Sequence, residues 1–215
     1  MRIAIIGATG YVGSVVLQEA LARGHEVTAV VRHVEKLPSH PKLTAKAVDV
    51  ADVAGLASAL AGSQAVIHAY APPRDLPVEE RIAAQRRGTR AILDAMKRAG
   101  VGRILAVGGA GTLVVPGGGR NMDRPDFPKE WEGGARSTAE VKEMLRLEPG
   151  IEWTFLSPSH LLVPGERTGV FRLGLDELLV GPDGESRISL ADYAVALIDE
   201  LEAPKHTGRR FTVGY

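Results

Sequence analysis

The 215-residue sequence contains no cysteine, which excludes disulfides, iron–sulfur clusters, thiolate zinc sites and cysteine nucleophiles together. Neither sign of charge is in excess, because Lys plus Arg and Asp plus Glu both number 26 and the formal net charge is zero. A neutral protein has no overall field to hold nucleic acid or an anionic membrane surface, so a small-molecule partner fits better. We expect a cysteine-free chain of this kind in the reducing cytoplasm.

Membrane-spanning segments and metal-binding patterns are also missing. The longest uncharged stretch, residues 104–119, contains six glycines and falls short of the about 20 apolar residues that span a bilayer. The apolar run at the N-terminus is short and has no cleavage site of small residues, so we expect no secretion signal. The histidines show no paired ligand spacing, and no metal site is expected. The length suits one domain over residues 1–215.

A glycine-rich turn near the start of the chain is the most informative feature present. Residues 2–6 indicate a strand buried on both faces, and the apolar residues from position 12 recur at helical spacing up to Gly24. Gly7, Gly10 and Gly13 lie between them. In such a turn the first glycine permits a tight bend, the second lets the backbone approach a pyrophosphate, and the third lets the helix pack against the strand. Free N–H groups and the positive end of the helix dipole then face the phosphates, which predicts a dinucleotide site.

Short apolar runs alternate with helical patterns along the chain, which favours a parallel sheet. Further strand-like runs occupy His25–Arg32, Thr44–Val48, Ala65–Tyr70, Arg103–Gly108 and Glu152–Leu156. Helical patterns occupy Tyr11–Arg23, Val53–Ala61, Val78–Ala99, Ser137–Leu147 and Leu190–Leu201. We therefore predict an α/β fold of Rossmann type, with a doubly wound parallel sheet, helices on both faces and a small C-terminal lobe on the substrate side.

Two segments interrupt this alternation and are predicted to be loops. They are Val115–Arg136 and Leu162–Arg187, which are rich in glycine, proline and charge. Because they follow the last strands, they would overhang the carboxyl edge of the sheet, where ligands bind. We expect them to form the substrate side, although plain surface connections are the alternative.

The residue after the second strand run selects between the two nicotinamide dinucleotides. NAD-binding proteins place an Asp or Glu about 20 residues beyond the glycine turn, where its carboxylate binds the ribose hydroxyls. Here this position holds Arg32, and residues 27–33 contain no acid. A guanidinium binds a 2′-phosphate through two parallel charged hydrogen bonds, so NADP is favoured over NAD.

The ends of the next two strands supply more of the predicted cofactor site. Asp49 and Val50 close the third run, where a side chain can reach the adenine amino group, although Asp49 is equally placed to cap the following helix. Ala69, Tyr70 and Ala71 end the fourth run at the point where the strand order reverses. Small side chains at that point let the pyrophosphate and ribose lie close to the backbone.

Several of these segments combine into a family pattern. They are the motif Gly7-Ala8-Thr9-Gly10-Tyr11-Val12-Gly13, Arg32, Asp49 and residues 88–93 and 100–103. With them the chain resembles the atypical short-chain dehydrogenase/reductase superfamily. Residues 107–112, 157–158, 164–169 and 188–194 are similar to its single-domain NAD(P)H-binding group, near biliverdin reductase B, flavin reductase and NmrA-like proteins. The resemblance implies that Gly7 to Gly13 and Arg32 hold the phosphates, that Asp49 and Val50 contact the adenine, and that the region of Pro158 faces the nicotinamide.

One pair of residues departs from that superfamily. Active members typically carry a Tyr four residues before a Lys, whose charge helps to lower the pKa of the phenol. Thr138 and Lys142 stand at this spacing here. A threonine hydroxyl titrates far above neutral pH and cannot act as a general acid or base. Lys142 is left as a ribose ligand or as an exposed lysine of its helix.

Three side chains are candidates to contact a substrate or move a proton. His160 follows the sixth strand run beside the expected nicotinamide site, has an unperturbed pKa of about 6.5, and resembles the histidine of flavin and biliverdin reductases. Thr112 is placed like a serine of relatives, although Gly109 is the alternative counterpart. Tyr70 is better placed as a wall of the cofactor cleft. A buried His, a capping Thr and a packing Tyr are the structural alternatives.

These features favour an NADP(H)-dependent oxidoreductase that reduces a flavin, a quinone or a related carbonyl acceptor, because such acceptors tolerate the missing tyrosine. The alternative is a non-catalytic NADP(H)-binding redox sensor of the NmrA-like kind that regulates a protein partner, so the sequence leaves enzymatic activity open. A nucleotide-sugar epimerase is disfavoured by the short C-terminal portion and the absent tyrosine. We expect a small-molecule acceptor, no nucleic acid or membrane partner, and a monomer or homodimer.

Overall fold

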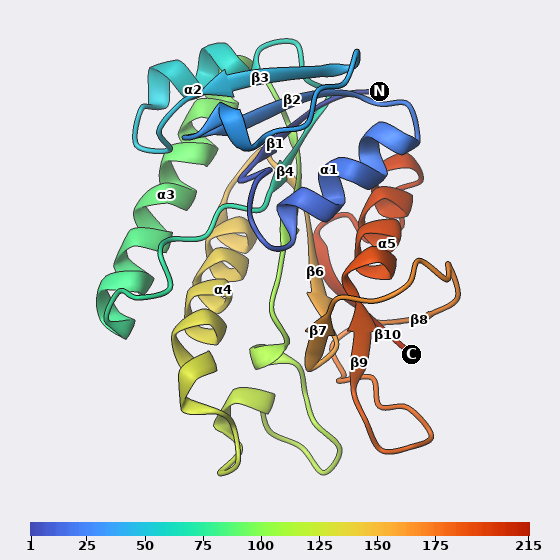
Figure 1. The fold of residues 1–215 in the computed structure, drawn as a ribbon. Helices are drawn as coiled ribbons and strands as arrows, with labels where there is room; N and C mark the ends of the chain where they lie inside the picture. The colour runs from blue at the N-terminus through green and yellow to red at the C-terminus, as the bar shows by residue number, and fades with distance from the viewer.

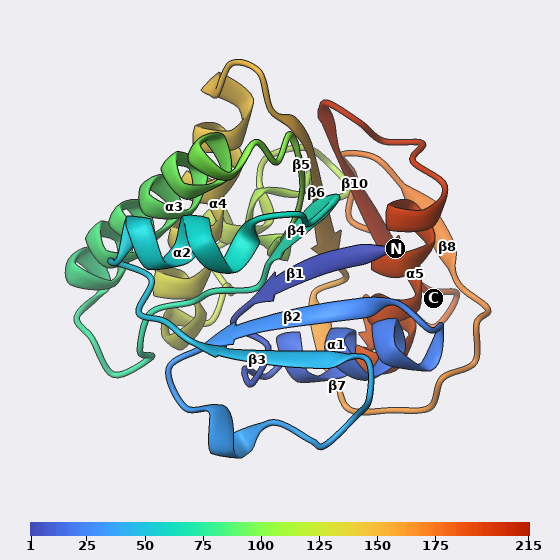
Figure 2. The ribbon, with the colours of Figure 1, turned by 90° about the horizontal axis from the view of Figure 1, so that it is seen from above.

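The computed structural model describes all 215 residues and contains one sheet of eight strands. In spatial order the strands are β3 (Leu43–Ala47), β2 (Glu26–Val31), β1 (Arg2–Ile6), β4 (Ala65–His68), β5 (Arg103–Val107), β6 (Glu152–Pro158), β10 (Arg209–Gly214) and β8 (Arg172–Gly174). All neighbours are parallel except β8, which runs antiparallel to β10 at the edge. The strand order reverses between β1 and β4, as in a doubly wound sheet, and Figure 2 shows this arrangement.

Helices cover both faces of the sheet (Figures 1 and 2). One face carries α1 (Gly13–Ala22) and α5 (Leu190–Glu202), and the other carries α2 (Val53–Leu60), α3 (Val78–Ala99) and α4 (Lys129–Leu147). Three short 3-10 helices, η1 (Val34–Lys36), η2 (Ala110–Thr112) and η3 (Asn121–Asp123), lie in the connections. The predicted Rossmann fold is therefore confirmed. No helix combines the length and apolar character needed to cross a membrane.

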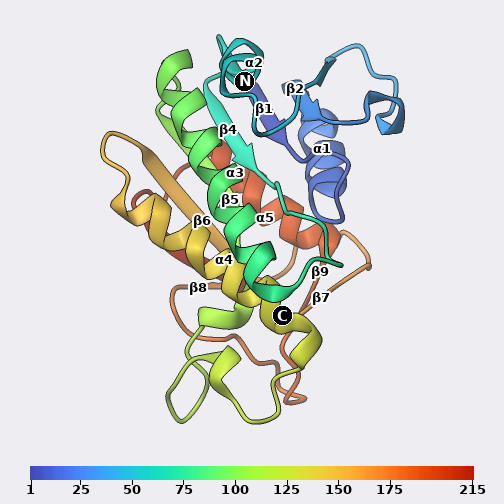
Figure 3. The same ribbon diagram turned by 90° about the vertical axis from the view of Figure 1, so that its left-hand side faces the viewer.

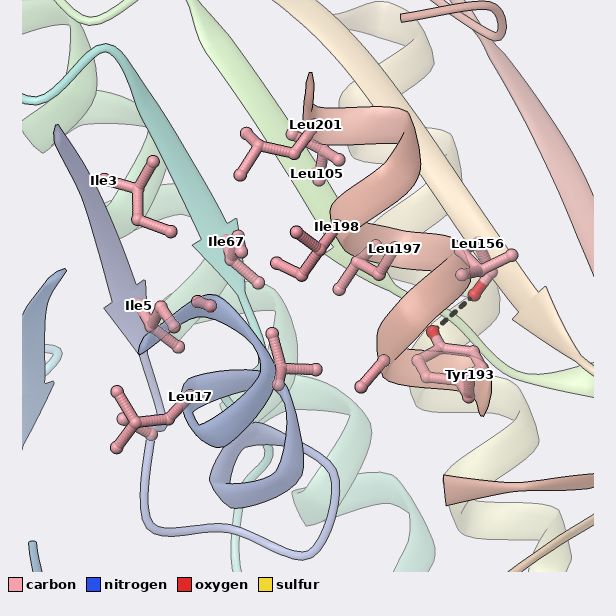
Figure 4. Close-up of a cluster of buried hydrophobic side chains, with 14 of the residues drawn as sticks. Ile3, Ile5, Leu17, Ile67, Leu105, Leu156, Tyr193, Leu197, Ile198 and Leu201 are labelled. Carbon is pink, nitrogen blue, oxygen red and sulfur yellow. Dashed lines mark hydrogen bonds between the residues drawn. The ribbon is translucent and has the colours of Figure 1, made fainter. Parts of the chain in front are cut away.

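Two hydrophobic clusters, one on each face, explain why β1 has no polar residue after its first position. Ile3 and Ile5 pack toward α1 and α5, whereas Ala4 and Ile6 pack toward α2, α3 and α4. Successive side chains of a strand point to opposite faces, so a strand buried on both sides must be apolar throughout. Figure 4 shows the first cluster, in which the buried Tyr193 hydroxyl donates a 2.8 Å hydrogen bond to the Leu156 carbonyl.

The predicted loop over residues 115–136 is wrong in its last part, because α4 begins at Lys129 and not near Ser137. Pro128 precedes the helix, and two glutamates in the first turn interact favourably with its dipole. Gly133 and Gly134 suggest a loop in the sequence, yet in the helix their Cα atoms lie against the Arg81 side chain of α3. A Cβ added to either glycine would make only ordinary contacts with Arg81, so the helix accommodates these glycines without needing them for packing.

The predicted loop over residues 162–187 also contains structure that the sequence did not indicate. It includes β8. The strand β7 (Leu161–Val163) at its start and the strand β9 (Arg187–Ser189) at its end pair with each other in parallel and form a separate two-stranded sheet. The C-terminal strand β10 was not predicted either. The connections next to β7 and β9, together with residues 108–128, extend beyond the carboxyl ends of β5 and β6, at the bottom of Figures 1 and 3. The backbone N–H of Val114 donates to the Asp176 carbonyl at 2.8 Å, which joins the two segments.

Candidate functional site

The glycine turn between β1 and α1 has no room for larger residues. Gly7 has φ +87°, and a Cβ added to it would lie 2.6 Å from the Ala69 carbonyl oxygen. A Cβ added to Gly13 would overlap the Gly7 carbonyl oxygen, and one added to Gly10 would lie 3.3 Å from the same atom. The turn is thus closed on itself and pressed against the end of β4, which is the arrangement the sequence predicts for these glycines.

Backbone donors of this turn are available to an anion. Gly7 and Gly10 donate to the Val30 and Gly7 carbonyls at 3.1 and 3.0 Å, and these bonds shape the turn. The N–H groups of Thr9, Tyr11 and Val12 have no acceptor in the protein, and no side chain caps α1. Free amides at a helix N-terminus bind phosphate groups. The turn therefore fits the pyrophosphate of a dinucleotide, with Ala8 forming its buried base.

Charged side chains meet at the expected adenosine end of the site. Burial raises the pKa of Tyr70, whereas Arg32 and Arg87 act to lower it and Asp49 acts to raise it, so all three charges lie near the Tyr70 hydroxyl. Tyr70 packs edge-on against Gly88 of α3, where an added Cβ would collide with its ring. Arg32 follows β2, and Arg87 precedes Gly88 on α3, so two different elements direct guanidinium groups toward this end.

Arg32 and Arg87 have no carboxylate partner, in contrast to Arg86 and Arg90 of α3. On α3, Arg86 pairs with Glu140 at 2.9 Å and Arg90 with Glu148 at 2.7 Å. Arg32 and Arg87 are exposed and make no ion pair. Arg87 was not singled out from the sequence, and its influence on Tyr70 together with Arg32 is a result of the fold.

Asp49 does not cap the following helix. Its carboxylate accepts a 2.8 Å hydrogen bond from the Ala51 N–H, while Asp52 is the N-cap of α2 and accepts from the Gly55 N–H at 2.9 Å. The capping alternative is therefore wrong. Asp49 is exposed and Val50 half-buried at the end of the β3 connection, and their contact with adenine stays a prediction.

A buried polar network supports the segment after β4. The Gln85 side-chain amide donates to the Tyr70 carbonyl at 3.4 Å and to the Thr89 hydroxyl at 3.3 Å. The His68 Nε2 atom lies 3.1 Å from the same hydroxyl, and burial lowers the pKa of His68 to about 4. This network holds Ala69 and Tyr70 against the glycine turn, and Ala71 follows as an exposed residue. Their predicted contacts with the cofactor are consistent with these positions.

The pair that replaces Tyr-x-x-x-Lys is poorly suited to proton transfer. The Thr138 hydroxyl donates to the Gly134 and Ala135 carbonyls at 3.0 and 3.1 Å, so its proton is held by its own helix. A Cβ added to Gly109 would lie 2.5 Å from the Thr138 Oγ1 atom, so Thr138 faces Gly109. Burial lowers the pKa of Lys142, and the nearby Arg210 acts in the same direction. Lys142 has no hydrogen-bond partner in the protein, and its role as a ribose ligand stays a prediction.

Thr112 takes part in a different set of contacts. Its carbonyl and its hydroxyl both accept hydrogen bonds from Arg210 Nη1, at 3.0 and 2.8 Å. Arg210 is buried on β10 and also pairs with Asp176. The arginine therefore fixes η2 to the C-terminal strand through Thr112. Gly109, the alternative that the sequence left open, is the residue that faces Thr138, and contact of Thr112 with a substrate stays a prediction.

His160 lies where the chain leaves β6, two residues after the buried Pro158. Asn121 Nδ2 lies 3.0 Å from His160 Nδ1, and the ring centroid of Trp131 lies 5.0 Å from that of His160. The segment reaches back to the glycine turn, because the Tyr11 hydroxyl donates to the Leu162 carbonyl at 3.2 Å. Neither Asn121 nor Trp131 was predicted as a site residue, because both lie in the segment predicted to be a loop.

These positions together fit a nicotinamide dinucleotide. The free amides of the glycine turn fit the pyrophosphate, and the unpaired Arg32 and Arg87 fit a phosphate at the adenosine end. The opposite end of the site lies near Gly109 and His160, beyond β5 and β6. The region outside the carboxyl ends of the strands is where doubly wound sheets bind nucleotides.

Comparisons with known proteins agree with this geometry. Residues 7–201 match the model of the NAD(P)H-binding family. The chain is 41% identical to the uncharacterized protein YwnB of Bacillus subtilis over 217 residues, or 99% of this chain and 98% of YwnB. It is 44% identical to a "putative epimerase" structure from Bacteroides thetaiotaomicron, with a TM-score of 0.90 and coverage of 100% and 96% of the two chains. It is 32% identical to a "putative NADH-flavin reductase" structure from Streptococcus pneumoniae, with a TM-score of 0.86 and coverage of 100% and 99%. The chain therefore belongs to the NAD(P)H-binding family of oxidoreductases, within the atypical short-chain dehydrogenase/reductase group.

Proposed function

We propose that the protein is an NADPH-dependent reductase whose acceptor is a planar conjugated molecule such as a quinone or a flavin. The observation that carries the proposal is the glycine turn with its free amides, which has the unpaired Arg32 and Arg87 at one end and His160 beside the Trp131 ring at the other. The similarity to a protein of Streptococcus pneumoniae named as an NADH-flavin reductase supports the choice of acceptor. We place the activity in the cytoplasm, where reduced nicotinamide is supplied.

The residues around the site suit hydride transfer better than carbonyl protonation. When bound, the reduced nicotinamide supplies a hydride, and one further proton from water completes the reduction of a quinone to a hydroquinone or of a flavin to its dihydro form. The protein therefore has to hold and orient two ring systems and exclude water between them. Thr138 contributes no proton, because its hydroxyl is bonded to carbonyls of its own helix.

The preference for NADPH is tested by Arg32→Ala. The guanidinium of Arg32 would bind the 2′-phosphate through charge-assisted hydrogen bonds, with Arg87 as a second positive charge. We expect NADPH to bind about 5-fold to 150-fold more weakly to the variant, from a loss of about 1–3 kcal/mol, while NADH binding changes little. Isothermal titration calorimetry with both nucleotides measures the two affinities.

Arg98→Ala is the matched control for this measurement. Arg98 is an exposed arginine near the C-terminus of α3 and has no ion pair, so its removal changes the net charge equally but leaves the site intact. Equal losses for NADPH and NADH in Arg32→Ala would contradict the proposed preference. Absence of binding of either nucleotide to the unmodified protein would contradict the proposed function as a whole.

A redox sensor of the NmrA-like kind is the second candidate, and the self-bonded Thr138 hydroxyl favours it. A sensor needs the nucleotide site but no proton relay. The two functions differ in one assay, because a reductase oxidises NADPH when menadione or FMN is added and a sensor does not. A sensor would also bind NADPH and NADP⁺ with clearly different affinities, since its output depends on that difference.

A further inference from the structure

Three aromatic rings from two separate segments of the chain meet beyond the carboxyl end of β6. The centroid of the His160 ring lies 5.0 Å from that of Trp131 and 6.2 Å from that of Phe127. Phe127 and Trp131 contact each other edge to face at 6.3 Å. Phe127 precedes α4, and Trp131 lies in its first turn. We call Phe127, Trp131 and His160 the aromatic cluster.

The aromatic cluster is not a closed core. The side chain of Trp131 remains 38% exposed, although its size and apolar character favour burial. Phe127 and His160 are half-buried. A large aromatic face therefore stays accessible next to the segment that returns to the glycine turn through the Tyr11 hydroxyl and the Leu162 carbonyl. Exposed aromatic faces bind flat rings by stacking.

A buried asparagine fixes the protonation of the histidine ring. Asn121 is completely buried, and its Nδ2 atom lies 3.4 Å from the Ala110 carbonyl oxygen and 3.0 Å from His160 Nδ1. A carbonyl oxygen only accepts hydrogen bonds, so the amide NH₂ group must face it. The same NH₂ group then donates to Nδ1, which places the ring proton of neutral His160 on Nε2.

The Nε2–H group is the free donor of this cluster. Burial lowers the pKa of His160, and the nearby Arg124 acts in the same direction, so the ring is neutral near pH 7. Nε2 has no hydrogen-bond partner in the protein. It is not completely buried, so it remains accessible to a ligand. An aromatic surface and one oriented N–H donor thus stand side by side.

We propose that the aromatic cluster is the acceptor site, in which a planar conjugated ring stacks on Trp131 while a carbonyl oxygen or ring nitrogen of that molecule accepts a hydrogen bond from His160 Nε2. Asn121 is the positioning residue, because it keeps the donor proton on Nε2. The inference rests on the proposed function for the presence of an acceptor, and it names the residues that bind it.

The two tryptophans of the chain allow a direct test of stacking. Trp131 belongs to the aromatic cluster, whereas Trp153 lies near the start of β6, at the opposite edge of the sheet. Trp153→Phe leaves Trp131 as the only indole, and Trp131→Phe leaves Trp153 as its matched control. Menadione and FMN are titrated separately into each variant, and free tryptophan under the same conditions corrects for absorption by the probe.

We expect saturable quenching of the emission in Trp153→Phe and only the quenching seen with free tryptophan in Trp131→Phe. Equal quenching in the two variants, or none in Trp153→Phe, overturns the inference. The measurement needs neither NADPH nor turnover. A protein that oxidises NADPH with menadione but shows no selective quenching of Trp131 therefore retains the proposed function and loses this acceptor site.

The role of Asn121 is tested by Asn121→Asp. A carboxylate beside Nδ1 would draw the ring proton to that atom and leave Nε2 without a proton in the neutral ring. We expect the ¹⁵N chemical shifts of His160 to report this change of tautomer, and the KM for menadione to rise about fivefold, the equivalent of one hydrogen bond, while NADPH affinity is unchanged.

Ser186→Ala is the control for the asparagine variant. The Ser186 hydroxyl accepts a 3.1 Å hydrogen bond from the backbone N–H of His160, so its loss disturbs the same residue without affecting the ring. A ring proton that stays on Nε2 in Asn121→Asp, or a changed tautomer with an unchanged KM, overturns the positioning role. If the aspartate variant does not fold, the ¹⁵N chemical shifts of His160 in the unmodified protein still test the assignment. A ring protonated on Nδ1 would contradict it.

Discussion

His68 gives the protein a defined sensitivity to acid. It is 2% exposed at the end of β4, and burial lowers the pKa of its imidazole from 6.5 to about 4. The unfolded chain binds a proton to this residue below pH 6.5, whereas the folded protein does so only near pH 4. The folded state is therefore favoured above pH 6.5, and the contribution is lost as the pH falls through this window.

The size of the effect follows from the two pKa values. A difference of about 2.5 units corresponds to about 3 kcal/mol once both states are protonated, of which about 2 kcal/mol is lost between pH 7 and pH 4.5. Burial also lowers the pKa of His25 and His160, so the total acid destabilisation includes other groups. A comparison with His68→Gln isolates the single residue, because the amide retains polar contacts and does not titrate.

Urea unfolding of both proteins between pH 7.5 and pH 4.5 measures this contribution. The free energy of unfolding should fall more steeply with acid in the unmodified protein, and the two curves should converge by about 2 kcal/mol. Parallel curves would refute the assignment, as would an NMR titration of His68 in the folded protein with a midpoint near 6.5. Nucleotide affinity at pH 7 serves as a check that the Tyr70 segment remains in place.

Two further substitutions test the packing that shapes the site. Gly13→Ala places a Cβ against the Gly7 carbonyl. We therefore expect a loss of about 1–3 kcal/mol in the free energy of unfolding and at least tenfold weaker NADPH binding. Gly102 is surrounded by open space, so the control Gly102→Ala should change the free energy of unfolding by less than about 0.5 kcal/mol. Equal effects of both alanines in urea unfolding and calorimetry would contradict this reasoning. Tyr193→Phe removes the buried hydrogen bond to the Leu156 carbonyl and should cost about 1 kcal/mol, and unchanged urea unfolding would show that the bond contributes nothing net.

The central strands were predictable from the sequence because their burial on both faces leaves a local signal. The run predicted at His25–Arg32 becomes β2 at Glu26–Val31, and the run at Arg103–Gly108 becomes β5 at Arg103–Val107. The strand β10 was missed because the groups that satisfy its buried polar side chain come from distant segments and not from its own residues. It begins with two arginines, and Arg210 is buried only because Asp176 and the Thr112 carbonyl satisfy its guanidinium. A contact between residues that distant leaves no local pattern.

The start of α4 shows the same limit at a helix. Glycine destabilises an isolated helix by about 1 kcal/mol relative to alanine, so Gly133-Gly134 reads as a loop when the sequence is considered alone. In the structure both residues lie inside α4, beside the Arg81 side chain of α3. Tertiary packing therefore overrides a local preference, and Trp131, which the helix carries into the aromatic cluster, could not be recognised before the helix was known.

The two halves of the site are consequently encoded in different ways. The nucleotide half depends on one turn, in which Gly7, Gly10 and Gly13 lie within seven consecutive residues. The other half depends on contacts between distant segments: Asn121 and His160 are 39 residues apart, and Thr112 and Arg210 are 98 apart. A substitution in residues 115–128 changes the second set of contacts and leaves the glycine turn unaltered. If the proposed acceptor site is correct, we expect variation of those segments to change which acceptor is bound while the nucleotide site is preserved, so that one fold can serve different acceptors.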